Sequence, residues 1–253
     1  RLVAAGAPHG TVSNMVRILR HDGRWAGRIR HNQLTDRVEL DGEPIQDHDE
    51  IALVVWLTDC YTMPAASPKV HEACVHTAYS NAYHPIREYL ARIHWDGTER
   101  VETWLQDYLG AAGTPLVREM GKRFLISAVA RVMDAGCKVD TVLILQGAQG
   151  SLKSTALRVL FGDRYHSDTP PDLRNMRDAA AQLQGLWCLE WAELDNMRRR
   201  DATTVKSFIS TQVDRYRPAY GRNVVERKRS CVICGTTNEL EFLADTTGER
   251  RFW

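Results

Sequence analysis

A loop rich in small residues, with one lysine and three hydroxyl side chains, lies near the middle of the chain. Its residues are, in order, Gly147, Ala148, Gln149, Gly150, Ser151, Leu152, Lys153, Ser154 and Thr155. The run before it, 141–145, is almost wholly apolar, which is typical of a strand buried on both faces of a parallel sheet. An apolar-periodic helical segment follows. Strand, glycine-containing loop and helix in this order predict a phosphate-binding loop.

The chemistry of such a loop follows from its backbone. Successive N–H groups curl around a phosphate at a helix N-terminus, where unpaired donors and the helix dipole favour an anion. Lys153 is expected to reach the β- and γ-phosphates of ATP, and the Ser154 hydroxyl to ligate Mg²⁺. Leu152 stands where such loops usually have glycine, and Gly150 is expected to supply the missing backbone freedom. The alternative is a turn that binds no ligand.

Acidic residues follow a second apolar run. The segment 186–189 is expected to be a strand, and it ends in Glu190, with Glu193 three residues later. We expect Glu190 to hold the metal, directly or through water, and Glu193 to polarise the attacking water, although the two roles could be exchanged. Glu193 could instead be a solvated acid in the first turn of a helix.

A third apolar run, 231–234, ends in Thr236, Thr237 and Asn238. The Asn238 amide could orient a hydrolytic water. Three buried strands alternating with helical segments at 153–160, 173–183 and 203–211 predict an open α/β sheet with flanking helices. We therefore expect a phosphate-binding-loop ATPase domain at 113–253, truncated at its C-terminal side. Residues 1–112 are expected to form a mostly helical accessory module with a short hairpin at 25–40.

Several motifs in the same order resemble the virulence-associated protein E family, whose motor is similar to the superfamily-three helicases of the AAA+ group. They are His84–Leu90 with Trp95–Gly97, Gly136–Asp140, the loop, Glu190–Leu194, Asp214–Gly221, and Thr237–Glu239 with Gly248–Trp253. The resemblance implies an ATP-driven DNA motor of a phage, plasmid or genomic island, often joined to a primase. It covers nearly the whole chain.

The resemblance also implies roles for individual residues. Asn238 matches the sensor asparagine, and Arg250 or Arg251 matches an arginine finger that enters a neighbour's ATP site, which requires a homo-oligomeric ring. Either arginine could instead make structural ion pairs. The stretch 214–230 matches a hairpin that is expected to contact single-stranded DNA through Arg215, Arg217, Tyr220, Arg222 and Lys228. Cations meet phosphates and tyrosines stack on bases, but such a charge run is more often a solvated face.

Composition agrees with a globular protein. The net charge of +1 conceals a basic stretch at 197–230, which has ten Lys/Arg and three acids, so the rest of the chain is acidic. No apolar run approaches the ~20 residues that cross a bilayer, and the first residues lack a signal-peptide pattern, so a cytoplasmic protein with no membrane partner is expected. The six cysteines are expected to be free thiols.

Two apparent metal motifs are given low weight. Cys231 and Cys234 lack a second Cys/His pair, and His71 and His76 are five positions apart and would diverge around a helix. Three functions remain open. The leading one is a helicase or translocase. A nucleotide-gated DNA-binding or loading module with little hydrolysis is the second, favoured by Leu152. A small-molecule kinase is the third, and it leaves the basic stretch unexplained.

Overall fold

The computed structural model describes residues 6–192, 199–216, 224–239 and 251–253. The chain divides into two compact units, residues 1–89 and 90–253, and each is described by itself. The division falls before residue 90 rather than at 112/113, because helix α5 packs on α6 of the second unit. Gly121 of α6 makes this packing possible, since a Cβ there would lie only 2.7 Å from the Leu105 side chain.

The first unit packs helices on a small antiparallel sheet of order β1-β2-β3. Thr11 caps the first helix, accepting a hydrogen bond from the Asn14 N–H. The hairpin predicted at 25–40 is confirmed by the pairing of β1 with β2. The core contains Met15, Leu19, Leu53 and Leu57, all fully buried. The elements of this unit are α1 (Val12–His21), β1 (Ile29–Asn32), β2 (Arg37–Leu40), β3 (Glu43–Pro44), α2 (Asp47–Tyr61), α3 (Ser67–Ser80) and the start of α4 (Pro85–Arg92).

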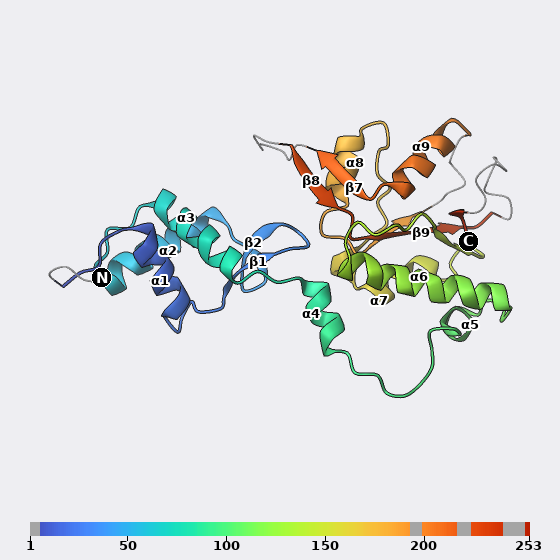
Figure 1. Ribbon diagram of the computed structural model, residues 1–253, viewed down its shortest axis with the longest axis horizontal. Coiled ribbons are helices and arrows are strands. Elements are labelled where there is room, and N and C mark those ends of the chain that lie inside the picture. Colours follow the sequence, from blue (N-terminus) through green and yellow to red (C-terminus); the bar gives the residue numbers. More distant parts are fainter. Residues whose placement is uncertain (1–5, 193–198, 217–223, 240–250) are drawn as a thin grey trace. The chain divides into compact units, whose positions relative to one another are not determined.

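The second unit is an α/β domain (Figure 1). Its four-stranded parallel sheet has the order β4-β9-β6-β5. This confirms the predicted α/β class and parallel sheet. An antiparallel pair, β7 with β8, stands between β6 and β9 in the sequence. The elements are α5 (Trp104–Leu109), α6 (Pro115–Met133), β4 (Leu143–Gln146), α7 (Lys153–Phe161), a 3₁₀ turn (Asp163–Tyr165), β5 (His166–Ser167), α8 (Met176–Gln182), β6 (Cys188–Trp191), α9 (Arg199–Ser210), β7 (Val213–Tyr216), β8 (Val225–Lys228) and β9 (Val232–Thr237).

Helices cover both faces of this sheet (Figure 1). On the face of α6 and α7, Phe161 packs edge-on against both Phe124 and Trp187. On the other face, Leu189 and Ile233 join Ala179 of α8 and Phe208 of α9 in one buried cluster; these two strand residues are almost completely buried. The sheet is therefore held rigidly between two layers, which fixes whatever its strand ends carry.

The first strand of the sheet is less buried than its sequence predicts. In β4 only Leu143 is buried, while Ile144 and Leu145 are half-buried and Gln146 is exposed. The reason is position: β4 is the last strand on its side of the sheet, and among the described residues only the short segment 251–253 runs along its outer edge. Val142 N donates to Arg251 O at 2.7 Å, and Ile144 N donates to Trp253 O at 2.7 Å. The prediction of burial on both faces was wrong for this strand.

Candidate nucleotide site

The loop between β4 and α7 has the strand–loop–helix context that the sequence predicted. Gly150 has φ +80° and Leu152 has φ +62° with ψ 24°, both in the left-handed region. For leucine that conformation costs about 1–2 kcal/mol, so Leu152 adopts it at a cost that glycine would not incur. Its side chain is 68% exposed and therefore leaves the inside of the loop clear. No side chain caps α7, so its first N–H groups face the loop.

Lys153, the first residue of α7, has its ammonium group inside the loop. Its Nζ donates to Gly147 O at 2.7 Å, to Ala148 O at 3.0 Å and to Ser151 Oγ at 3.3 Å. A fourth bond, of 2.9 Å, reaches Asn238 Oδ1 just beyond β9. The structure thus brings together two residues that the sequence assigned separately to the loop and to a sensor position. An ammonium group beside the start of a helix that has no side-chain cap is suited to polyanion binding.

Glu190 at the end of β6 faces the same loop. Ser154 Oγ donates to Glu190 Oε1 at 2.5 Å, and Thr236 Oγ1 donates to the same oxygen at 2.8 Å. The Glu190 side chain is completely buried. The predicted metal pair, Ser154 and Glu190, is therefore in direct contact. Parallel strands β4, β6 and β9 all end at this edge, which is where open α/β sheets bind ligands.

His166 is a site residue that sequence reasoning missed. Its Nε2 lies 2.9 Å from Glu190 Oε2, and its side chain is only 2% exposed. It belongs to β5, a strand of two residues without an apolar run, so no sequence pattern marked it. A polar residue pair, His166–Ser167, just before an acidic residue was the only available signal.

The residues present fit both ligands that the loop implies. A hydroxyl and a carboxylate oxygen converge at Ser154 and Glu190, and oxygen donors are what Mg²⁺ prefers. The left-handed turn at Gly150 and Leu152, the uncapped start of α7 and the Lys153 ammonium suit the phosphates of a nucleotide. Nothing in this donor set favours a softer metal, because His166 contacts Glu190 from the opposite oxygen.

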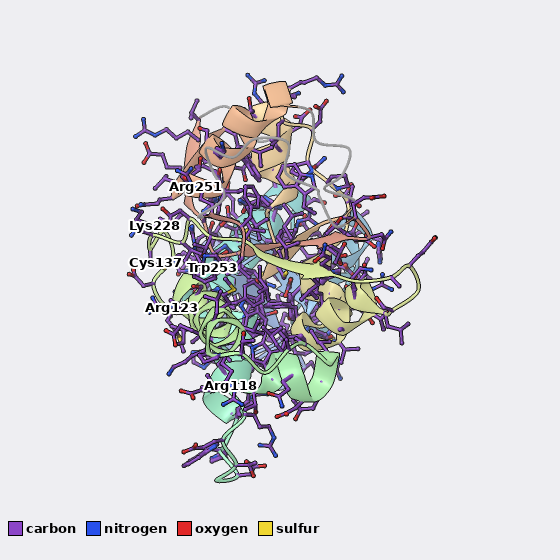
Figure 2. The ribbon with its side chains drawn as sticks, turned by 90° about the vertical axis from the view of Figure 1, so that its right-hand side faces the viewer. Arg118, Arg123, Cys137, Lys228, Arg251 and Trp253 are labelled. Carbon is purple, nitrogen blue, oxygen red and sulfur yellow. The ribbon has the colours of Figure 1, made fainter. Side chains whose placement is uncertain are left out.

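The C-terminal segment lies at the other end of β4. Arg251 O bonds to Val142 N, whereas the loop begins after Gln146, so Arg251 and the loop are separated along the strand by about 13 Å. Figure 2 shows Arg251 on the same side of the unit as Lys228 and Cys137. The Nε atom of Arg251 is buried without a hydrogen-bond partner among the described residues. The backbone of Arg251 is therefore held at the end of β4 away from the loop of its own chain. Arg250 lies outside the described residues.

The predicted hairpin exists as β7 and β8. Arg215 is 71% exposed and bonds Glu226 on the facing strand at 2.9 Å, and Lys228 is exposed at the end of β8. At its base, Arg229 and Asp214 form a buried ion pair of 2.6 Å, which fixes where the hairpin leaves the domain. Three predicted DNA contacts, Arg217, Tyr220 and Arg222, lie outside the described residues, as does Glu193.

Comparison with known proteins decides the family. A sequence profile described as the virulence-associated protein E-like domain matches residues 90–253, which is more than half of the chain. The chain belongs to the virulence-associated protein E-like family. This confirms the resemblance inferred from the motifs, and the matched range coincides with the second compact unit. No curated protein matches the chain.

Solved structures show the fold that this VapE-like chain shares. The apo structure of the NrS-1 C-terminal region matches with a TM-score of 0.50 and 14% identity, covering 88% of this chain and 57% of that one. Its A form matches with a TM-score of 0.42 and 17% identity, covering 61% of this chain and 36% of that one. This chain therefore spans little more than half of the first of these structures.

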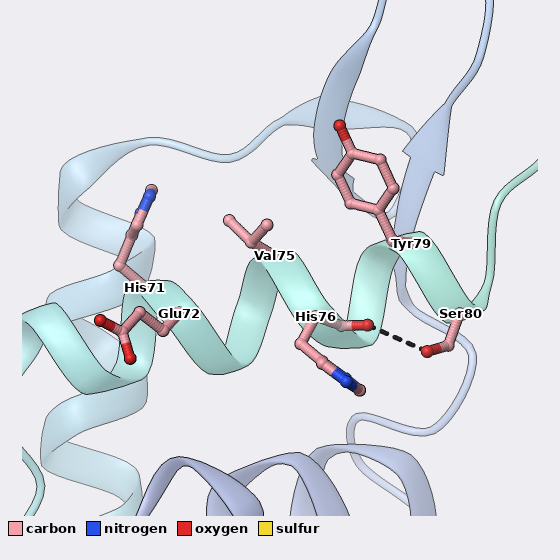
Figure 3. Close-up of a pocket in the computed structure, with 6 residues that line it drawn as sticks. All are labelled: His71, Glu72, Val75, His76, Tyr79 and Ser80. Atoms are coloured by element: carbon pink, nitrogen blue, oxygen red, sulfur yellow. Dashed lines mark hydrogen bonds between the residues drawn. The ribbon is translucent and has the colours of Figure 1, made fainter.

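The two apparent metal motifs lie in different compact units of the VapE-like chain. His71 and His76 line a shallow pocket on α3 and point to different sides of the helix (Figure 3). His71 bonds Glu50 at 2.7 Å. Cys231 and Cys234 are buried free thiols. No group of three potential metal-ligating side chains occurs in the part of the chain that the structure describes. No helix among the described residues is long and apolar enough to cross a membrane.

Proposed function

We propose that this chain is the ATP-hydrolysing motor of a protein that replicates a mobile genetic element, acting as a helicase or translocase on single-stranded DNA. One observation carries the proposal: Lys153 with Asn238, and Ser154 with Glu190, converge on a single loop from three strand ends. Lys153 would hold the phosphates, Ser154 and Glu190 the Mg²⁺, and Asn238 the water. Bound Mg²⁺ would shield phosphate charge.

The position of Arg251 supports assembly. The Arg251 backbone lies at the end of β4 away from the loop of its own chain, and its guanidinium would enter the ATP site of a neighbouring copy in a ring. Such a finger stabilises charge developing in phosphoryl transfer. The exposed cations of β7 and β8 are Arg215 and Lys228. They would bind the phosphates of single-stranded DNA that lies along the hairpin. A cytoplasmic location and a primase partner belong to the same proposal.

A second function, nucleotide-gated loading of DNA with little turnover, is favoured by one observation. Lys153 is bound by four oxygens of the chain, and Leu152 holds a left-handed conformation, so nucleotide entry must rearrange these contacts. If these contacts of the loop rearranged slowly, the chain would bind ATP but hydrolyse it slowly.

Phosphate release with and without single-stranded DNA separates the two functions. The motor predicts turnover that DNA stimulates and that Lys153→Ala abolishes, while Arg123→Ala on the exposed side of α6 leaves it unchanged. ATP-dependent assembly on DNA without turnover supports the loader. Absence of both ATP binding and turnover contradicts the two functions together.

A further inference from the structure

The buried carboxylate of Glu190 has a hydrogen-bond partner on each oxygen. Oε1 accepts from Ser154 and Thr236, and Oε2 lies 2.9 Å from His166 Nε2. The side chains of Glu190 and His166 are 0% and 2% exposed. Water does not reach this pair, so the direction in which the carboxylate points is set by these three partners alone among the described residues.

Glu190 links His166 to the start of α7. His166 contacts Oε2 of Glu190, and Ser154 donates to Oε1. A serine hydroxyl that donates its hydrogen to Glu190 keeps its oxygen lone pairs free for a cation. The direction of those lone pairs depends on where Glu190 Oε1 is held, which depends in turn on the contact at Oε2.

His166 itself is held firmly. Its strand β5 pairs in parallel with β6, with His166 opposite Cys188, and Trp187 N donates to Tyr165 O at 2.8 Å. These backbone bonds join β5 to the strand that carries Glu190. A ring fixed on one strand and a carboxylate fixed on the next keep their separation when the loop rearranges.

We propose that His166 is a positioning residue for the magnesium site, acting through Glu190 on the Ser154 hydroxyl. The inference rests on the proposed function. His166 would act through its contact with Glu190 rather than on the nucleotide itself. Removing a residue that hydrogen-bonds to a metal ligand typically lowers metal affinity or activity by about 10–100-fold.

The test compares His166→Phe, which keeps an aromatic ring but removes the hydrogen bond, with His166→Gln, whose amide can restore it. Binding of a fluorescent non-hydrolysable ATP analogue to the full chain is measured in Mg²⁺ and in EDTA. We expect His166→Phe to weaken binding about 10–100-fold in Mg²⁺ and to leave EDTA binding within a few-fold. His166→Gln is expected to restore most of the Mg²⁺ effect. Ser167→Ala, on the same strand, is the matched control.

Each outcome of this comparison supports or overturns the positioning role of His166. If His166→Phe binds as the wild type does in Mg²⁺, or weakens equally in Mg²⁺ and EDTA, the positioning role is overturned. Should His166→Phe lower the unfolding temperature markedly, His166→Asn, whose shorter amide withdraws from Glu190, replaces it in the same comparison. Failure of the proposed function looks different: the wild-type chain itself then binds no nucleotide in either condition.

Discussion

Lys153 Nζ donates a 2.9 Å hydrogen bond to Asn238 Oδ1, joining the start of α7 to the end of β9 across 85 positions of sequence. The contact places the amide that would orient a water beside the ammonium that would hold a phosphate. Neither partner is placed by its own element alone: the parallel register of β4 with β9 brings them together.

Replacing Asn238 by alanine removes this amide from the loop. We expect ATP turnover to fall about 100-fold, which is the typical effect of removing one hydrogen-bonding group positioned at the reacting centre. Nucleotide affinity should change only a few-fold. Steady-state phosphate release and nucleotide titration measure the two quantities. Gln146→Ala is the control, since its amide donates to Glu239 O instead. Unchanged turnover in Asn238→Ala would remove this residue from the site.

Arg251 offers a test of action between subunits. Arg251→Ala is expected to lower turnover by about 10³, the effect typical of an arginine finger. Lys153→Ala should also be inactive. Mixing the two variants creates interfaces in which an intact loop meets an intact Arg251, so part of the turnover should return. Arg118→Ala, an exposed arginine of α6 labelled in Figure 2, is the control. A mixture as inactive as its parents would contradict a finger supplied in trans.

The hairpin cations are expected to bind DNA without reading sequence. Arg215→Ala with Lys228→Ala should weaken single-stranded DNA binding at every sequence and reduce the salt dependence by about 0.7 per lost phosphate contact. Loss of the exposed Arg215–Glu226 pair should cost at most about 1 kcal/mol of stability. Fluorescence anisotropy at several salt concentrations measures the slope. Arg174→Ala, at an exposed arginine paired with Asp172, is the control. An unchanged dependence of DNA affinity on salt concentration in the double variant would show that the hairpin cations are only solvated and do not bind DNA.

How far the sequence predicts this fold depends on the strength of each local pattern. The strands that became β6 and β9 were found because they are apolar runs, and the helix α7 because its loop precedes it. The burial of β4 was overestimated because strand order cannot be derived from an apolar run. β5 was missed because two residues carry no periodicity. Its absence from the prediction concealed His166.

The candidate site was predicted as separate residues rather than as a geometry. The loop, Ser154 and Glu190 follow from motif spacing, and the structure places them in contact. That Glu190 is completely buried between Thr236 and His166 could not be derived, since it depends on how β5, β6 and β9 align. Glu193, Arg217, Tyr220, Arg222 and Arg250 stay predictions, because they lie outside the described residues.

Stability should depend on pH through His84. Burial, together with the nearby Arg87, lowers the pKa of His84 to about 4 from its usual 6.5, and its Nδ1 accepts the Arg87 N–H, which requires the unprotonated ring nitrogen. Between pH 4 and 6.5 the unfolded chain therefore binds more protons, and stability rises with pH. We expect the free energy of unfolding at pH 5 to be lower than at pH 7.5 by on the order of 2 kcal/mol from this group.

Urea unfolding of the full chain at the two pH values measures that difference. His84→Gln should reduce it, whereas His48→Gln, at a side chain that is 79% exposed, should leave it unchanged. An equal pH dependence in wild type and His84→Gln would contradict the assignment.

The central claim is that residues 147–155 bind a nucleotide's phosphates while Glu190 and Ser154 secure magnesium. Calorimetric titration of a non-hydrolysable ATP analogue with Mg²⁺ into wild type, Lys153→Ala and Glu190→Gln tests it most directly. We predict one nucleotide per wild-type chain, binding at least about 100-fold weaker in Lys153→Ala, where the phosphates lose a charge-assisted partner. In Glu190→Gln, binding should no longer respond to Mg²⁺. No heat of binding in the wild type, or equal affinity in Lys153→Ala, would contradict the account.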